Sequence, residues 1–169
     1  TMNFATLYGQ GPHALSRQLG VEYEVAQQYI IEYFEQFPRV REWMQKTLEF
    51  GYKNEYVETL WGRKRYIPEL KADNRMIKSA GERAAINHPV QGTAADMIKK
   101  AMVEINTSLR GPMKSDRGNL DSCQLILQVH DELLFEAPKA EIRKLVEMVS
   151  RQMQGAAQFK VPLDVSVKV

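Results

Sequence analysis

Two short apolar runs separated by only two residues constrain the fold of this chain more than any other feature of its sequence. Residues 124–129 and 132–136 are rich in Leu, Ile, Val and Phe, and only His130 and Asp131 lie between them. Short apolar runs this close together are typical of two antiparallel strands joined by a tight turn. We therefore expect a hairpin here, and with it at least one antiparallel sheet.

Most of the remaining sequence has helical periodicity. Apolar residues at three- and four-residue spacing predict amphipathic helices over residues 22–37, 38–51, 74–88, 93–109 and 140–153. Gly51 is expected to end the second of these helices. Pro89 is expected to separate the third from the fourth, because proline removes a backbone hydrogen bond inside a helix.

Three further segments complete the expected organisation. Alternation around Val57, Thr59 and Trp61, with Gly62 as the turn, predicts another hairpin over residues 56–67. Residues 110–122 are rich in turn formers and predict an exposed connection, and alternating valines predict a strand over residues 161–169. Helices come first and a strand, helix and strand come last, so the expected fold class is α+β.

Composition limits the class of protein. At 169 residues the chain is long enough to bury a core without staples, and its single cysteine, Cys123, cannot form an internal disulfide, which fits a reducing compartment such as the cytoplasm. No apolar run approaches the roughly 18 residues of a membrane helix, so no membrane partner is expected. The net charge is only +2, but residues 63–83 hold seven basic and three acidic side chains. That local excess permits phosphate binding and equally describes a solvated face.

The turn between the two apolar runs carries the densest chemistry. His130, Asp131 and Glu132 are three adjacent ionisable groups, an arrangement that is costly unless it is solvated or serves a site. Two neighbouring carboxylates at a turn can approach one cation, and Mg²⁺ prefers such oxygen ligands. An ordinary polar turn is the alternative. Two-metal phosphoryl transfer would need a further carboxylate from another element.

Two other groups of residues suit a nucleic-acid partner. Phe4 and Tyr8 would share one face of a helix, either as core or as a platform on which a base stacks. Arg83, Asn87 and Gln91 are spaced four apart, so their side chains could reach acceptors in a minor groove. Capping of helix ends explains the amides equally well.

Taken together, four segments resemble the bacterial family A DNA polymerases. Residues 1–9, 60–66, 82–96 and 128–132 carry motifs of that family in the same order, and the resemblance spans essentially the whole chain. It implies the C-terminal part of a fingers-and-palm polymerase domain. Residues 1–52 would then be a helical fingers-like segment, and residues 53–169 a hairpin, helices and part of an antiparallel palm sheet.

The resemblance also implies roles for individual residues. Asp131 would be a catalytic metal ligand, with Glu132 as an auxiliary acidic neighbour. Phe4 would lie beside the incoming nucleotide's sugar, and Tyr8 near the template base. The residues implied to contact primer-template DNA are Arg83, Asn87, Gln91, Gln128 and His130.

The implied activity is DNA-directed DNA synthesis by two-metal phosphoryl transfer, with Mg²⁺ as cofactor and primer-template DNA and deoxynucleoside triphosphates as partners. The family's triphosphate-binding lysine would immediately precede Thr1, and its first palm aspartate would lie further upstream. We therefore expect a fragment of a longer polymerase that is inactive alone and that self-associates through exposed sheet edges.

Two other functions remain open at this stage. The chain could be a non-catalytic module that binds duplex DNA, in which case His130 and Asp131 only form a turn. It could also derive from a phage-type single-subunit RNA polymerase, which shares the palm chemistry. Phe4 and the sequence from Gln128 to Glu132 favour DNA synthesis.

Overall fold

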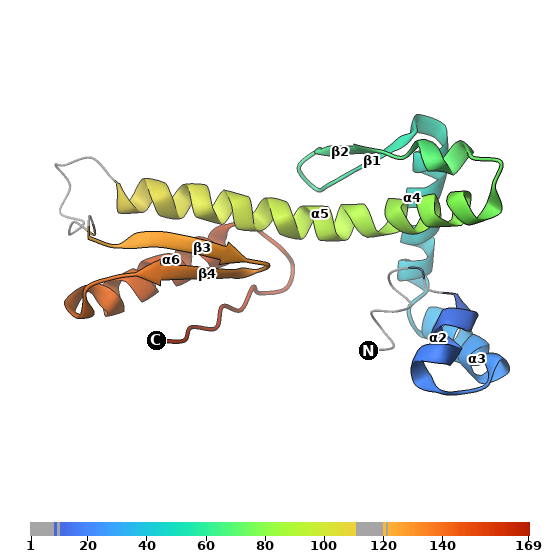
Figure 1. Ribbon diagram of the computed structural model, residues 1–169, viewed down its shortest axis with the longest axis horizontal. Helices are drawn as coiled ribbons and strands as arrows, with labels where there is room; N and C mark the ends of the chain where they lie inside the picture. Colours follow the sequence, from blue (N-terminus) through green and yellow to red (C-terminus); the bar gives the residue numbers. More distant parts are fainter. Residues whose placement is uncertain (1–8, 10, 111–119, 121) are drawn as a thin grey trace. The chain divides into compact units, whose positions relative to one another are not determined.

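The computed structural model describes residues 9, 11–110, 120 and 122–169 (Figure 1). These residues form five α-helices, two short 3-10 helices and two sheets of two antiparallel strands each. The expected α+β class is therefore confirmed. The chain forms two compact units, residues 1–93 and 94–169, whereas the expected boundary between polymerase subdomains at residues 52 and 53 stays a prediction. Of the described helices, none combines the length and apolar character needed to span a bilayer.

The first unit begins with three helices, α2 (Pro12–Leu19), α3 (Tyr23–Gln36) and α4 (Pro38–Asn54). Helix α3 confirms the prediction for residues 22–37. The expectation that Gly51 ends α4 is wrong, because the left-handed residue that ends this helix is Glu55, with φ +64°. Gly51 instead lies buried inside the helix, where an added Cβ would come within 3.1 Å of the Leu70 side chain. Close packing explains this glycine.

A hairpin and a short helix follow α4. Strands β1 (Tyr56–Glu58) and β2 (Lys64–Tyr66) pair antiparallel, and the 3-10 helix η1 spans Pro68–Lys71. Gly62 occupies the turn with φ +78°, as expected. The strands are shorter than predicted, because Thr59 and Trp61 belong to the turn. Below the hairpin, a small core is formed by the buried side chains of Val57, Ile67, Leu70 and Ala85.

Helix α5 runs without interruption from Arg75 to Leu109. Its start is capped by Asn74, whose side-chain oxygen accepts the N–H of Met76 at 2.9 Å. The predicted break at Pro89 is wrong, because Pro89 lies inside the helix. A proline removes only one backbone donor, and packing of buried side chains on both sides, such as Ala85 and Ile105, stabilises the remainder of this long helix.

The second unit holds the hairpin predicted from the two apolar runs. Strands β3 (Gln124–Val129) and β4 (Glu132–Glu136) pair antiparallel with the predicted bounds, and an irregularity interrupts their pairing at Ile126. The 3-10 helix η2 (Lys139–Glu141) leads into α6 (Ile142–Gly155), two residues later than predicted. The core of this unit consists of buried residues of α5, α6 and the flanking segments: Ala101, Ile105, Leu109, Leu120, Cys123, Leu145, Val149 and Ala156.

The predicted strand over residues 161–169 is not formed in the structure. Leu163 and Val165 are half-buried and alternate with exposed residues, so the period of two persists. A strand also requires hydrogen bonds to a neighbouring strand, and no described segment pairs with these residues. The prediction of a strand is therefore wrong, although the alternation on which it was based is present in the exposure of the side chains. The predicted connection at residues 110–122 falls mainly outside the described residues.

Candidate active site

The β3–β4 turn carries the acidic residues singled out by the sequence. Val129 pairs with Glu132, so only His130 and Asp131 form the loop. His130 adopts a left-handed conformation with φ +54°, which histidine tolerates better than most residues. The Gln128 amide donates a hydrogen bond to the His130 carbonyl at 2.9 Å. This local bond and the two-residue loop place Asp131 at the tip of a rigid hairpin.

Both carboxylates at this tip are exposed. On β4, Leu133 and Phe135 pack against the core, so the alternation of the strand directs Glu132 to the opposite face. Within the described residues, no hydrogen bond or ion pair engages the side chain of Asp131 or Glu132. The two side chains are therefore available to a cation.

The donor set at the tip fits a hard divalent ion in part. Carboxylate oxygens are the ligands that Mg²⁺ prefers, and protein sites commonly supply one or two of them while water and substrate phosphates supply the rest. Among the described residues, no cluster of three or more His, Cys, Asp or Glu side chains could hold a metal alone. Asp131 and Glu132 thus suit a site that substrate completes.

Three of the predicted DNA-contacting residues lie together on α5. Arg83, Asn87 and Gln91 follow one another at four-residue spacing within the unbroken helix, so they share one face. Neither amide lies at a helix end, which removes the capping explanation. The side-chain oxygen of Asn87 is buried and finds no hydrogen-bond partner in the described part of the chain. A buried acceptor without a partner is costly, which marks Asn87 as a candidate functional residue.

The remaining predicted site residues divide into two groups. Gln128 and His130 lie beside Asp131 at the hairpin tip, and Gln128 is opposite Leu133 in the ladder. Phe4 and Tyr8 lie outside the described residues, so their predicted positions on a shared helical face stay predictions. Sequence reasoning did not predict that Thr59, His88 and Gly92 lie together, as they do where the β1–β2 turn meets α5.

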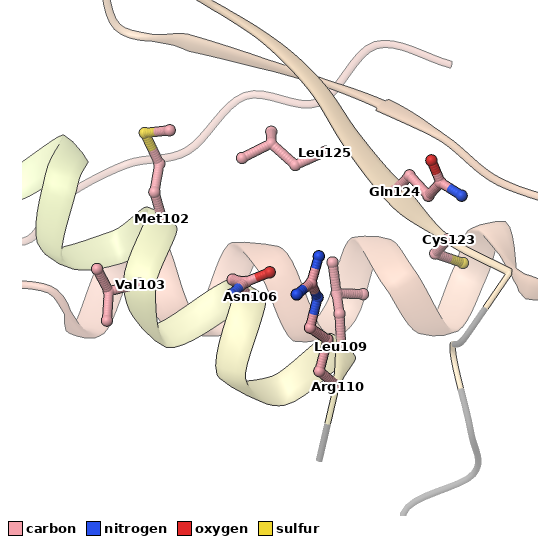
Figure 2. Close-up of a pocket in the computed structure, with 8 residues that line it drawn as sticks. All are labelled: Met102, Val103, Asn106, Leu109, Arg110, Cys123, Gln124 and Leu125. Carbon is pink, nitrogen blue, oxygen red and sulfur yellow. The ribbon is translucent and has the colours of Figure 1, made fainter.

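A pocket in the second unit contains none of the predicted site residues (Figure 2). It lies between the end of α5 and the start of β3, and its polar lining includes Asn106, Arg110 and Gln124. Cys123 also lines it, but burial raises the pKa of this thiol, which keeps it protonated and weakly nucleophilic. The candidate site residues lie instead at the hairpin tip and on α5.

Comparison with known proteins assigns the class. The model of DNA polymerase family A matches residues 1–169, and the chain belongs to this family. The resemblance inferred from four motifs is thereby confirmed over the full length.

Relatives within the family are DNA polymerases I. The chain is 45% identical over 169 residues to the thermostable DNA polymerase I of Thermus aquaticus, covering 100% of this chain and 19% of that protein. It is 42% identical over 167 residues to DNA polymerase I of Deinococcus radiodurans, covering 99% of this chain and 16% of that protein. The chain thus spans about a fifth of the length of these relatives.

A solved structure agrees with the sequence comparisons. The POL domain of Pol1 from M. smegmatis, in complex with DNA primer-template and dNTP, matches with a TM-score of 0.89 and 38% identity. The match covers 98% of this chain and 28% of that chain.

Proposed function

We propose that this chain forms the C-terminal fingers-and-palm part of a DNA-directed DNA polymerase that extends a primer with deoxynucleotides. The observation that carries the proposal is the exposed Asp131–Glu132 tip in a chain that matches family A from end to end. The solved relative with primer-template and dNTP supports the same two partners here.

The proposed reaction is a nucleotidyl transfer. The primer 3′-hydroxyl oxygen forms a bond to the α-phosphorus of the triphosphate, the bond from that phosphorus to the bridging oxygen breaks, and pyrophosphate leaves. Bound Mg²⁺ would lower the pKa of the attacking hydroxyl and neutralise charge on the leaving group. Asp131 is the proposed ligand from this chain and Glu132 the auxiliary one. Because both residues lie at one tip, the site would also need a carboxylate from the upstream part of the polymerase and oxygen atoms of the substrate phosphates.

The proposed DNA contacts follow from the two groups of polar residues. Arg83, Asn87 and Gln91 form a row from which amide and guanidinium groups reach the minor groove, where all base pairs present shared acceptors. On Asn87 the group that can reach such acceptors is the side-chain NH₂, because the amide nitrogen donates and the amide oxygen only accepts. The contacts proposed near the primer end come from Gln128 and His130, and those to the incoming nucleotide from Phe4 and Tyr8.

The isolated chain is proposed to be inactive. It spans only 19% of the Thermus aquaticus relative, and loss of a charge-stabilising element costs about 100-fold or more in rate. We further infer a cytoplasmic location, because the single cysteine fits a reducing compartment. The isolated chain is also proposed to self-associate, because β3 and β4 form a two-stranded sheet with both outer edges unpaired in the described residues. Light scattering at rising protein concentration tests the association.

Primer extension by the full-length polymerase tests the central proposal. Asp131→Asn keeps the size of the side chain and removes its charge, so we expect extension with Mg²⁺ to fall on the order of 100-fold or more while duplex binding persists. Glu132→Gln should have a smaller effect. The matched control is Glu136→Gln, which alters an exposed glutamate at the other end of β4 and should leave the rate unchanged.

Three outcomes would contradict the proposal. If Asp131→Asn extends primers as fast as the wild-type protein, the carboxylate does not hold a catalytic ion. If the full-length protein binds duplex DNA but incorporates no deoxynucleotide, the non-catalytic binding module is correct. Faster incorporation of ribonucleotides than of deoxynucleotides would favour the RNA polymerase alternative.

A further inference from the structure

We propose that the turn of the β1–β2 hairpin braces the proline-containing part of α5 and thereby positions Asn87 and Gln91 for reading the primer-template duplex. This inference rests on the proposed function and adds positioning residues to it. The brace consists of Thr59, Arg63, His88, Gly92 and Thr93. All five lie in the first unit.

Helix α5 has an intrinsic weak point where the brace contacts it. Pro89 has no N–H, so the carbonyl of Ala85 loses its usual donor four residues later, and the proline ring crowds that carbonyl. A proline in a helix interior costs about 3 kcal/mol relative to alanine. Asn87 lies two residues before Pro89 and Gln91 two residues after it, so both depend on the geometry of the weakened turn.

Polar contacts from the hairpin reach residues on both sides of this point. The N–H of Leu60 donates to the Thr93 hydroxyl at 2.9 Å, and the Arg63 guanidinium donates to the Gly92 carbonyl at 3.0 Å. Before the proline, the His88 Nε2 atom lies 3.5 Å from the Arg63 carbonyl. The hairpin therefore holds α5 at residues 88, 92 and 93 at once.

The turn itself is closed by Thr59. Its hydroxyl accepts the N–H of Arg63 at 3.1 Å, and its backbone N–H donates to the Arg63 carbonyl at 3.0 Å. Thr59 is only 4% exposed and His88 only 7%. Two buried polar side chains therefore lie at the contact between the turn and α5. Their hydrogen bonds fix both the conformation of the turn and its position on the helix.

Gly92 lets the turn approach α5 at a distance that no other residue permits. A Cβ at this position would lie 2.7 Å from the Thr59 Cγ2 atom and 3.0 Å from the His88 Cε1 atom. Real Cβ atoms essentially never come closer than 3.0 Å to a neighbour, so any side chain would push the turn and helix apart.

The brace acts on DNA reading through sequence adjacency. Asn87 immediately precedes His88, and Gln91 immediately precedes Gly92, so a shift of the braced residues moves both amides. Hydrogen bonds weaken steeply outside about 2.7–3.2 Å, and a misplacement of about 1 Å can cost on the order of 100-fold in rate. The brace residues are accordingly positioning residues, which need not touch the DNA.

The test uses Gly92→Ala in the full-length polymerase, with the double variant Gly92→Ala/Thr59→Ser as the rescue. Serine keeps the hydroxyl that closes the turn and removes the methyl group that the new Cβ would strike. We expect Gly92→Ala to lower the ratio of extension from matched over mismatched primer ends on the order of tenfold, and to raise KM for primer-template more than it lowers kcat. The double variant should restore most of both. Gly155→Ala is the control, because an added Cβ there meets no neighbour within 4 Å.

A second pair of variants covers the case in which Gly92→Ala does not fold. Thr93→Val removes the acceptor of the Leu60 N–H and keeps the shape of the side chain, whereas Thr93→Ser keeps the hydroxyl. The first should reduce mismatch discrimination and the second should not.

The outcomes separate this inference from the proposed function. Lower thermal stability of Gly92→Ala with unchanged mismatch discrimination would show a purely structural role and overturn the brace. Failure of Thr59→Ser to restore discrimination would also overturn it. If the wild-type polymerase does not extend primers at all, the proposed function fails, whatever the variants do.

Discussion

Replacing Gly81 with alanine should destabilise the first unit, although replacing a helical glycine with alanine usually stabilises a protein. Gly81 lies in α5, and a helical glycine replaced by alanine ordinarily gains about 0.5–1 kcal/mol of stability. Here an added Cβ would lie 2.9 Å from the Glu69 Cβ, 3.1 Å from the Glu69 carbonyl carbon and 3.1 Å from the Leu70 nitrogen. Two of these three atoms are backbone, so they cannot rotate away.

The magnitude follows from setting the two effects against each other. Forcing an extra carbon into a packed core costs about 1–3 kcal/mol, which exceeds the propensity gain. The expected net loss is about 1–2 kcal/mol, which for a chain of this size lowers Tm by about 2–8 °C. Gly155→Ala in α6 is the matched control, because its added Cβ meets no neighbour and should leave Tm unchanged or higher.

Tryptophan fluorescence suits the measurement, because both tryptophans, Trp43 and Trp61, lie in the first unit. Thermal unfolding followed by fluorescence should show the loss for Gly81→Ala, and far-UV circular dichroism should report the control in the second unit. If Gly81→Ala raises the midpoint as a simple propensity gain would, the packing of η1 against α5 described above is wrong.

Two further predictions concern pH and the second core. Burial, together with a 2.5 Å hydrogen bond to Glu82, raises the pKa of Tyr52 from its ordinary value of 10.0 to about 12. The neutral hydroxyl therefore contributes to the free energy of unfolding, and this contribution is fully present below pH 10 and is lost as the pH rises to 12. Denaturant titrations across that range should show a steeper loss for the wild type than for Tyr52→Phe, and parallel losses would contradict this assignment. Ile105→Ala, at a fully buried position, should cost about 2–5 kcal/mol by circular dichroism at 222 nm, whereas an equal change at the exposed Val103 should cost far less.

Local patterns predicted the elements that depend on neighbouring residues. The β3–β4 hairpin was predicted with its observed bounds because two apolar runs flank a loop too short for anything but a tight turn. Helix α3 followed from an apolar stripe that needs no distant partner to be recognised.

The errors arose where distant residues decide the outcome. Gly51 looks like a helix stop, yet it serves close packing against Leu70, which is nineteen positions away along the chain. Pro89 looks like a break, yet packing along the rest of α5 offsets one lost hydrogen bond. The alternation of residues 161–169 indicates extension, but pairing requires another strand.

The candidate site shows the same difference between features that follow from local sequence and features that depend on distant residues. The order of four motifs predicted Asp131 and the row from Arg83 to Gln91 as site residues, and their roles stay predictions. The contact between Thr59 and Gly92 was not foreseen, because it joins residues 33 positions apart through a methyl group and a missing side chain. Sequence periodicity does not predict a contact of this kind.

The irregularity at Ile126 reverses the facing of side chains partway along β3. Near the base of the hairpin, Leu125 pairs with Phe135, and near the tip, Gln128 pairs with Leu133. Since Phe135 and Leu133 pack against the same core, the odd-numbered Leu125 and the even-numbered Gln128 lie on the same face of β3, although Gln128 itself is exposed. Deleting Ile126 would therefore leave each of these cross-strand pairs in register and make β3 a regular strand, so pairing along the hairpin does not depend on the extra residue.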